Sequence, residues 1–352
     1  MIILLGNTIK GKKCTKGFVK HNFVNNIGEA PQLLSISPSK IHTKNRVYTF
    51  DNAEIPITRW KKEVELLELI LKRRIYDIFV DENNLSLIYL CTRPPHKVKD
   101  EKILWNDNFM NAENNLLVLG VNDTGNVYAD ISATPHLLIA GSTKTGKSTL
   151  CKSLLLQCIK KGYLIYIADF KGIDFTNSFW SNNSYMIYHP SEIIGVCEMI
   201  GFHIDSRKKL FTETDCNNIE EYIKKTKDKL PRIIFAIDEI AEALDKHELT
   251  KEKKELISSI ESHLFTLARQ GRAYGVHLIL ATQRPSADII DGQIKNNIDL
   301  RICGRTPDPQ LSQIILGNTE AFSRIPHNSR GMFLTNENDL FMGYWVDDKN
   351  FV

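Results

Sequence analysis

Short apolar runs alternate with longer amphipathic stretches over much of this 352-residue chain. The runs predicted as strands are residues 137–140, 163–168, 233–237, 276–281 and 300–303. Stretches with helical periodicity lie between or beside them, at residues 148–160, 191–211 and 240–270. Alternation of this kind favours an α/β fold with a mostly parallel central sheet and helices on both faces.

Two predicted hairpins flank this region. Residues 116–121 and 127–129 enclose a turn that is rich in Asn, Asp and Gly. Residues 331–335 and 340–345 enclose a second polar turn near the end of the chain. We therefore expect the α/β domain to occupy residues 114–352.

The first part of the chain has a different pattern. Residues 46–50 alternate like a strand, residues 60–74 have the periodicity of an amphipathic helix, and residues 75–80 and 85–90 indicate two more strands. The polar stretch 97–115 indicates a linker. The sequence thus predicts a small α+β domain at residues 1–113, and the chain length agrees with two domains.

Composition restricts the class of protein further. Hydrophobic residues make up 42% and charged residues 25%, as in ordinary globular proteins. No apolar run approaches the roughly 18 residues that a membrane helix needs, so we expect no transmembrane segment within the chain. The seven cysteines are odd in number and never spaced CxxC, which gives no sign of a disulfide framework or a zinc site. A reducing, cytoplasmic location fits this pattern.

The net charge of +3 is distributed unevenly. Five lysines precede the first acidic residue, Glu29; they are Lys10, Lys12, Lys13, Lys16 and Lys20. One interpretation is a solvated, mobile basic arm. The other is an arm that contacts a phosphate backbone or an acidic partner. The sequence leaves both open.

The most specific motif follows the predicted strand 137–140. It reads Gly-Ser-Thr-Lys-Thr-Gly-Lys-Ser over residues 141–148, the GxxxxGK[ST] pattern of a phosphate-binding loop. Gly141 and Gly146 let backbone N–H groups converge on a phosphate, and Lys147 reaches the β- and γ-phosphates. Ser148 can ligate Mg²⁺. The residues expected to bind the nucleotide are Gly141, Ser142, Thr143, Lys144, Thr145, Gly146, Lys147, Ser148 and Thr149.

Two further strands end in polar residues that suit nucleotide hydrolysis. Asp238 and Glu239 follow the apolar run 233–237. We expect Asp238 to hold Mg²⁺ together with Ser148, and Glu239 to activate the attacking water. An acidic pair that caps the following helix is the alternative. Gln283, after strand 276–281, is expected to touch the γ-phosphate or the water.

The strand at residues 163–168 is expected to insert between the phosphate-loop strand and the acidic strand in the sheet. It ends in Asp169-Phe170-Lys171-Gly172. This segment would line the site or contact a polymer, or it would form a plain turn.

Four blocks together resemble the motor domain of FtsK/SpoIIIE-type DNA translocases, including the relatives on conjugative and integrative elements. The blocks are residues 135–141 with the phosphate loop, 205–211 with 218–222, 237–239, and 267–286. Residues 294–301 are similar to the family's segment that bears an arginine finger, which places that role on Arg301. Residues 311–313 read Leu-Ser-Gln where the family usually has Asp-Ser-Arg, so one basic contact is missing or moved.

The resemblance implies a RecA-like P-loop NTPase that uses ATP and Mg²⁺ to move double-stranded DNA, for transfer or segregation of a mobile element. It also implies a homo-oligomer, a hexameric ring, in which each nucleotide lies between subunits. Lys147, Ser148, Asp238 and Glu239 of one subunit would act there with Arg301 of its neighbour, and Gln283 is the further catalytic residue. Partners in a transfer apparatus or a membrane-anchored protein would fit. Residues 1–113 only loosely resemble the accessory domain of mobile-element members. The alternatives are an ATP-binding adaptor of a transfer apparatus, and a RecA-like helicase or packaging motor.

Overall fold

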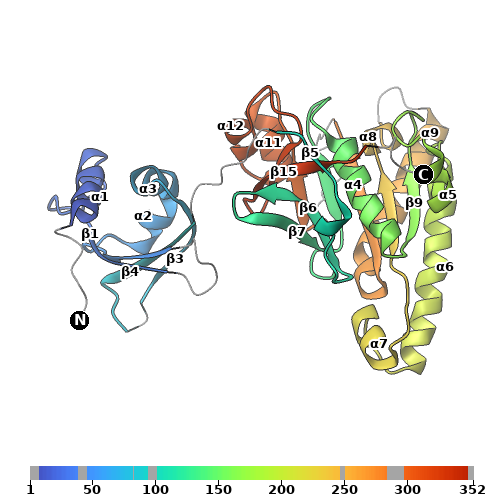
Figure 1. Ribbon diagram of the computed structural model, residues 1–352, viewed down its shortest axis with the longest axis horizontal. Coiled ribbons are helices and arrows are strands. Elements are labelled where there is room, and N and C mark those ends of the chain that lie inside the picture. The colour runs from blue at the N-terminus through green and yellow to red at the C-terminus, as the bar shows by residue number, and fades with distance from the viewer. Residues whose placement is uncertain are drawn as a thin grey trace. The chain divides into compact units, whose positions relative to one another are not determined.

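The computed structural model describes residues 8–38, 46–81, 83–93, 101–245, 250–283 and 297–347. The chain forms two compact units, Met1–Pro95 and His96–Val352. Figure 1 shows the elements of both.

The first unit is a four-stranded antiparallel sheet with short helices. Its elements are α1 (Ile9–Lys20), β1 (Gln32–Pro38), β2 (Arg46–Asp51), α2 (Ile57–Lys62), α3 (Val64–Leu71), β3 (Arg74–Val80) and β4 (Leu87–Arg93). The strand order is β1-β2-β4-β3. Phe18, Phe23, Phe50 and Trp60 are fully buried and pack against one another. The expected α+β character is therefore present, but the helix expected at residues 60–74 is divided into α2 and α3.

Of the two interpretations of the basic segment, the solvated, mobile arm is wrong, because the lysines lie on α1. The Thr8 side chain caps this helix by accepting a hydrogen bond from Gly11 N at 3.2 Å. Cys14 and Phe18 on its inner side are buried in the core of the unit. Burial of an aromatic side chain outweighs the mutual repulsion of solvated lysines, so the segment is helical.

The second unit contains one large mixed sheet and the helices that cover it. Its strands are β5 (Ile103–Leu104), β6 (Leu116–Asn122), β7 (Gly125–Asp130), β8 (Leu137–Ala140), β9 (Leu164–Ala168), β10 (Tyr185–Ile187), β11 (Ile233–Ile237), β12 (Val276–Thr282), β13 (Leu300–Cys303), β14 (Met332–Thr335) and β15 (Leu340–Trp345). Its helices are η2 (Asp107–Phe109), α4 (Lys147–Lys160), α5 (Ser178–Asn183), α6 (Glu192–Glu213), α7 (Ile219–Thr226), α8 (Ile240–Ala243), α9 (Lys251–Gln270), η3 (Gly271–Tyr274), α11 (Pro309–Leu316) and α12 (Glu320–Arg324).

Strand order in this sheet is β10-β9-β11-β12-β8-β13-β14-β15-β6-β7, with β5 paired to β15. The pairings from β10 to β13 are parallel, and those from β13 to β7 are antiparallel. The predicted, mostly parallel α/β core and both hairpins are thus confirmed.

The predicted position of strand 163–168 is wrong. This strand, β9, pairs with the far side of β11, and β12 inserts between the acidic strand β11 and the phosphate-loop strand β8. Every residue of β12 is buried, as a central strand covered on both faces requires. Leu164 of β9 is only half-buried, since β9 lies beside the short edge strand β10.

Alternate residues of each central strand serve the two faces of the sheet. Ile234 and Ala236 of β11 pack with α4, and Ile233, Phe235 and Ile237 pack with α6 and α9. Figure 1 shows α4 and α6 on opposite sides of the strands.

The segment expected to be a linker packs on the second unit where it is described. Ile103 pairs with Tyr344 of β15, and the ring of Phe109 stacks on that of Tyr344 at 4.6 Å between centroids. The expected boundary between residues 113 and 114 therefore falls inside the second unit.

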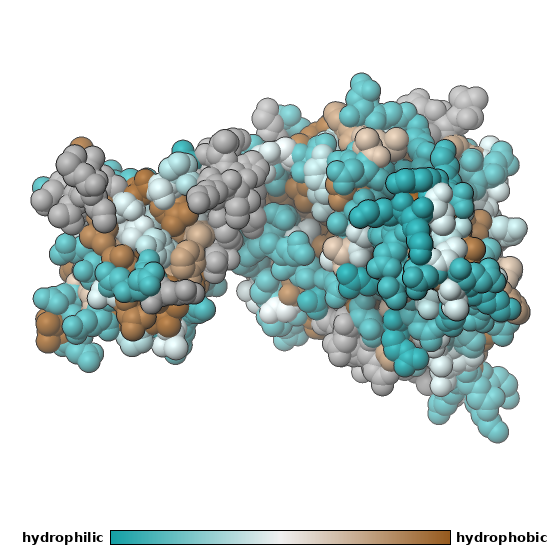
Figure 2. Space-filling model, turned by 90° about the horizontal axis from the view of Figure 1, so that it is seen from below, coloured by the Kyte–Doolittle hydropathy of each residue, from teal (hydrophilic) through white to brown (hydrophobic). Residues whose placement is uncertain are grey.

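The outer surface of the second unit is polar in the view of Figure 2, where hydrophilic side chains predominate. Among the described residues, no helix is long and apolar enough to span a bilayer.

Candidate functional site

The phosphate loop (residues 141–148) follows β8 and has a backbone that only glycine permits at two positions. Gly141 has φ +146° and Gly146 has φ +101°. A Cβ atom on Gly141 would lie 3.1 Å from Cα of Gly304, and one on Gly146 would lie 3.3 Å from Cα of Gly331. The loop is therefore packed against two other glycine segments of the same unit.

Backbone hydrogen bonds fix the loop in this position. Gly304 N donates to Ala140 O at 2.7 Å and Ser142 N donates to Arg305 O at 2.9 Å. Gly331 N donates to Thr145 O at 2.8 Å. The segments after β13 and before β14 thus bind the backbone of the loop, and the loop continues directly into α4.

Lys147 is buried at the first position of α4. Its ammonium group donates to Gly141 O at 2.9 Å and to Ser142 O at 3.3 Å. Burial lowers the pKa of Lys147 to about 8, and the nearby carboxylates of Glu239 and Asp238 oppose this shift. Most of the group is charged at neutral pH, beside the positive end of a helix, which suits an anion.

Asp238 lies at the carboxyl end of β11 and is also buried. Burial raises its pKa to about 7, helped by the negative charges of Asp174 and Asp169 and opposed by a hydrogen bond from Ser148. The structure thus brings Ser148 and Asp238 together, as the sequence predicted. The buried Oδ1 of Asp238 has no hydrogen-bond partner among the described residues. A hydroxyl and an unsatisfied carboxylate oxygen are the donors that Mg²⁺ prefers.

The segment after β9 forms a turn that brings a further carboxylate to the site. Asp169 accepts hydrogen bonds from the backbone N–H groups of Gly172, Asp174 and Phe175, each at 3.0 Å. This turn places Asp174 within hydrogen-bonding reach of Asp238. The sequence interpretation missed Asp174, although an Asp followed three residues later by Gly is a turn signal.

Glu239 is held by the end of β12. Its Oε1 accepts from Thr282 Oγ1 at 2.8 Å, and Gln283 N donates to Oε1 at 3.1 Å and to Oε2 at 3.0 Å. The side-chain oxygen of Gln283 accepts a hydrogen bond from Thr143 Oγ1 of the phosphate loop at 2.8 Å. Because β12 lies between β8 and β11, the residues at its end contact both the phosphate loop and Glu239. Thr282 was not among the predicted site residues.

Arg301 lies on β13, in register with Leu138 of β8. Its backbone N–H donates to Asn336 Oδ1 at 2.8 Å, and its buried Nε has no hydrogen-bond partner among the described residues. Residues 284–296, which include parts of the blocks at 267–286 and 294–301, lie outside the described residues.

Residues 311–313, where the sequence departs from the family pattern, lie on α11, and two of their side chains bind the backbone that follows this helix. Ser312 Oγ donates to Asn318 O at 2.8 Å, and Gln313 Nε2 donates to Gly317 O at 2.8 Å.

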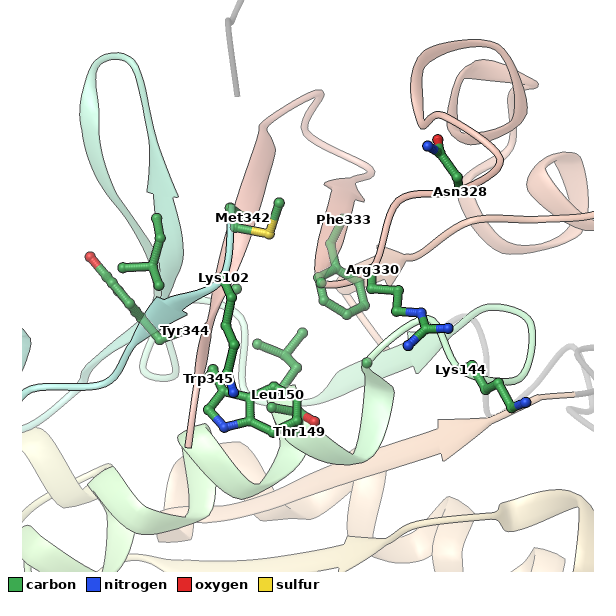
Figure 3. Close-up of a pocket in the computed structure, with 14 residues that line it drawn as sticks. Lys102, Lys144, Thr149, Leu150, Asn328, Arg330, Phe333, Met342, Tyr344 and Trp345 are labelled. Atoms are coloured by element: carbon green, nitrogen blue, oxygen red, sulfur yellow. The ribbon is translucent and has the colours of Figure 1, made fainter. Parts of the chain in front are cut away.

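A cavity of about 640 Å³ adjoins the phosphate loop (Figure 3). Its lining combines Lys144 and Thr149 with aromatic residues of β14 and β15. The ammonium group of Lys102 lies 3.8 Å from the ring centroid of Trp345. A concave, partly aromatic cavity of this size suits a small organic molecule. No local pattern in the sequence predicts this cavity, since its walls come from distant segments.

A network of buried basic side chains occupies the amino-terminal end of the central strands. Arg207 of α6 donates to the carbonyl groups of Tyr274 and Pro231. Arg232 donates to Glu220 Oε1 at 2.7 Å and contacts His277 Nε2 at 3.2 Å. The block at 205–211 and 218–222 therefore connects α6 and α7 to the sheet, away from the phosphate loop.

A phosphate loop at the end of a central strand, with an acidic strand two positions away and β12 between them, defines a RecA-like P-loop NTPase. The profile of the FtsK/SpoIIIE family matches residues 101–287. The chain belongs to the FtsK/SpoIIIE family.

Individual relatives agree with this assignment. The DNA translocase FtsK of Campylobacter jejuni is 28% identical over 302 residues, which cover 82% of this chain and 30% of that protein. The DNA translocase FtsK of Clostridium acetobutylicum is 34% identical over 233 residues, or 62% of this chain and 29% of that protein. The chain thus matches less than a third of the length of these curated relatives.

Solved structures extend the likeness. The pCW3 conjugation coupling protein TcpA, in a monomer form with ATPγS, is 32% identical with a TM-score of 0.68, over 97% of this chain and 96% of that one. This likeness therefore includes nearly all of the first unit. EssC of Geobacillus thermodenitrificans (ATPases 2 and 3) shares the fold, with 20% identity and a TM-score of 0.56 over 72% of this chain and 48% of that one.

Proposed function

We propose that this chain is an ATP-driven motor that moves double-stranded DNA in the transfer or segregation of a mobile element. The observation that carries the proposal is a chain of hydrogen bonds between Glu239 and the phosphate loop. Thr282 and Gln283 donate to Glu239, and Gln283 accepts from Thr143 of the loop. The family membership and the likeness to a conjugation coupling protein support the choice of DNA as substrate and of conjugation as the process.

The phosphate loop would hold the triphosphate of ATP. Backbone N–H groups of residues 141–148 and the Lys147 ammonium would neutralise its β- and γ-phosphates. Lys147 would exchange its contacts with the Gly141 and Ser142 carbonyls for phosphate oxygens, which compensates for its burial. Glu239, fixed at its position by β12, would accept a proton from the water that attacks the γ-phosphorus.

Ser148 and Asp238 would hold Mg²⁺. The bound cation would neutralise charge on the β- and γ-oxygens. Asp238 fits this role because its buried Oδ1 has no hydrogen-bond partner among the described residues and would gain one ligand bond.

The cavity beside the loop would receive the nucleoside. Trp345, which is 39% exposed, offers aromatic surface to a base, and Lys102 and Arg330 offer donors to the ribose or the base. Trp345 of β15 and Thr149 of α4 both line this cavity (Figure 3).

The active form would be a homo-oligomeric ring, a hexamer, around the duplex. Arg301 of one subunit would approach the nucleotide of its neighbour and stabilise the charge that develops in the transition state. A membrane-anchored component of a transfer apparatus would recruit the motor.

ATP turnover with and without duplex DNA tests the proposal. We expect DNA to stimulate phosphate release, and we expect Lys147→Ala and Glu239→Gln to abolish it. Glu239→Gln should still bind ATP, because Glu239 lies outside the phosphate loop. Equal turnover with and without DNA would contradict a motor, and ATP binding without turnover would favour an adaptor.

A further inference from the structure

We propose that the outer face of α1 is a second binding surface for the phosphate backbone of duplex DNA, separate from the ATPase site. The surface consists of four exposed lysines; they are Lys12, Lys13, Lys16 and Lys20. This inference rests on the proposed function only in that duplex DNA is the ligand. Binding at this surface does not require ATP hydrolysis.

The lysines project from one side of a rigid helix. Lys12, Lys16 and Lys20 are spaced four residues apart, which places them along the same side of an α-helix. The opposite side holds Cys14 and Phe18, both buried in the core. Packing of these two side chains therefore fixes the direction of the charged side relative to the core of the unit.

The charge of this surface is not balanced within its surroundings. The helix contains no acidic residue, and neither does β1, on which it packs. On α3, the other neighbour, Glu68 pairs with Arg74, and the exposed Glu65 forms no ion pair with these lysines among the described residues. The helices α6, α7 and α9 differ, since each interleaves acidic and basic residues. Among the described residues, no ion pair involves the four lysines.

The spacing fits a nucleic-acid backbone. From Lys12 to Lys20 the helix rises about 12 Å at 1.5 Å per residue. One DNA strand carries about one phosphate per 3.4 Å of helix axis, so three or four phosphates lie within that span. Lysine ammonium groups bind phosphates as point charges and need no particular base sequence.

A membrane surface is the less suitable partner. A helix that binds lipid needs an exposed apolar face beside its basic one. The apolar side of α1 is buried in the protein core. The exposed apolar residues of the helix are Ile9 and Val19, near its two ends.

The test compares the full chain carrying Lys12→Ala, Lys16→Ala and Lys20→Ala with a matched control. The control carries Lys224→Ala, Lys227→Ala and Lys229→Ala, three exposed lysines in and after α7. Fluorescence anisotropy with a labelled duplex is measured over a range of salt concentrations.

We expect the α1 variant to bind at least about ten-fold more weakly at 0.1 M salt, with the slope of log K against log salt lower by up to about 2.7. The corresponding Lys→Arg variant should restore binding, which excludes misfolding as the cause. Basal ATP turnover should be unchanged, so failure of the ATPase and failure of this surface are distinguishable. Equal effects of the α1 and α7 variants, or none, would overturn the proposal. Lost binding to phosphatidylserine vesicles with unchanged DNA binding would overturn it in favour of a membrane.

Discussion

Thr282→Val tests whether β12 positions the proposed catalytic carboxylate. Thr282 is fully buried, and its hydroxyl donates to Glu239 Oε1 at 2.8 Å. Valine has nearly the same shape, so the substitution removes the hydrogen bond and leaves the packing of the strand almost unchanged. The three-centre hydrogen bond from Gln283 N–H to the two oxygens of Glu239 remains, but a carboxylate held from one residue alone can rotate away from the attacking water.

The size of the effect follows from the bond that is lost. A hydrogen bond to a charged group contributes about 1.5–3 kcal/mol. Each 1.36 kcal/mol in the activation barrier changes a rate about ten-fold. Since the Gln283 bond is kept, we expect the lower end of this range, a decrease of about ten-fold in kcat.

The assay is steady-state ATP hydrolysis in the presence of duplex DNA. KM for ATP should change little, because the phosphate loop is untouched. Thr282→Ser keeps the hydroxyl and should retain most of the activity. If Thr282→Val had a kcat within two-fold of the wild type while its melting temperature was unchanged, Thr282 would not position Glu239.

Two other predictions concern stability. His136 accepts a hydrogen bond from Leu278 N at Nδ1, and burial lowers its pKa to about 4 from the ordinary 6.5. Because the unfolded chain then binds more protons between these values, the free energy of unfolding should fall by up to about 3 kcal/mol as the pH decreases from 6.5 to 4. His136→Asn should flatten this fall in denaturant titrations and exposed His21→Asn should not; equal pH dependence in all three proteins would contradict the argument. A Cβ on Gly304 would lie 3.2 Å from Phe333 Cε1 and from Thr145 Cβ, so Gly304→Ala should cost about 1–3 kcal/mol and weaken ATP binding in calorimetry. Gly195→Ala, where a Cβ meets nothing within 4 Å on α6, should instead stabilise by up to about 1 kcal/mol, and a Gly304 variant that binds ATP normally would show that the loop adapts.

The strands of the central sheet and the helices that cover its two faces were largely predictable. Helices show apolar residues at helical spacing, and central strands such as β11 are continuous apolar runs, since all five of its positions are buried. Several elements were missed, and for two kinds of them the cause is clear. Short edge strands such as β10 and β5 have too few residues to show a period, and α1 was hidden because its lysines outnumber its two buried apolar side chains, Cys14 and Phe18.

For the proposed site, the sequence by itself determined the phosphate loop and the acidic pair, since their chemistry depends on residues adjacent in the chain. The tertiary structure decided which strand lies between them. It placed β12 there instead of β9, and so brought Thr282 to Glu239 and Gln283 to Thr143. It also decided that Asp174 lies beside Asp238 and that Trp345 lines a cavity at the phosphate loop. Strand order depends on how whole elements bury their faces against one another, and no local sequence pattern specifies such long-range packing.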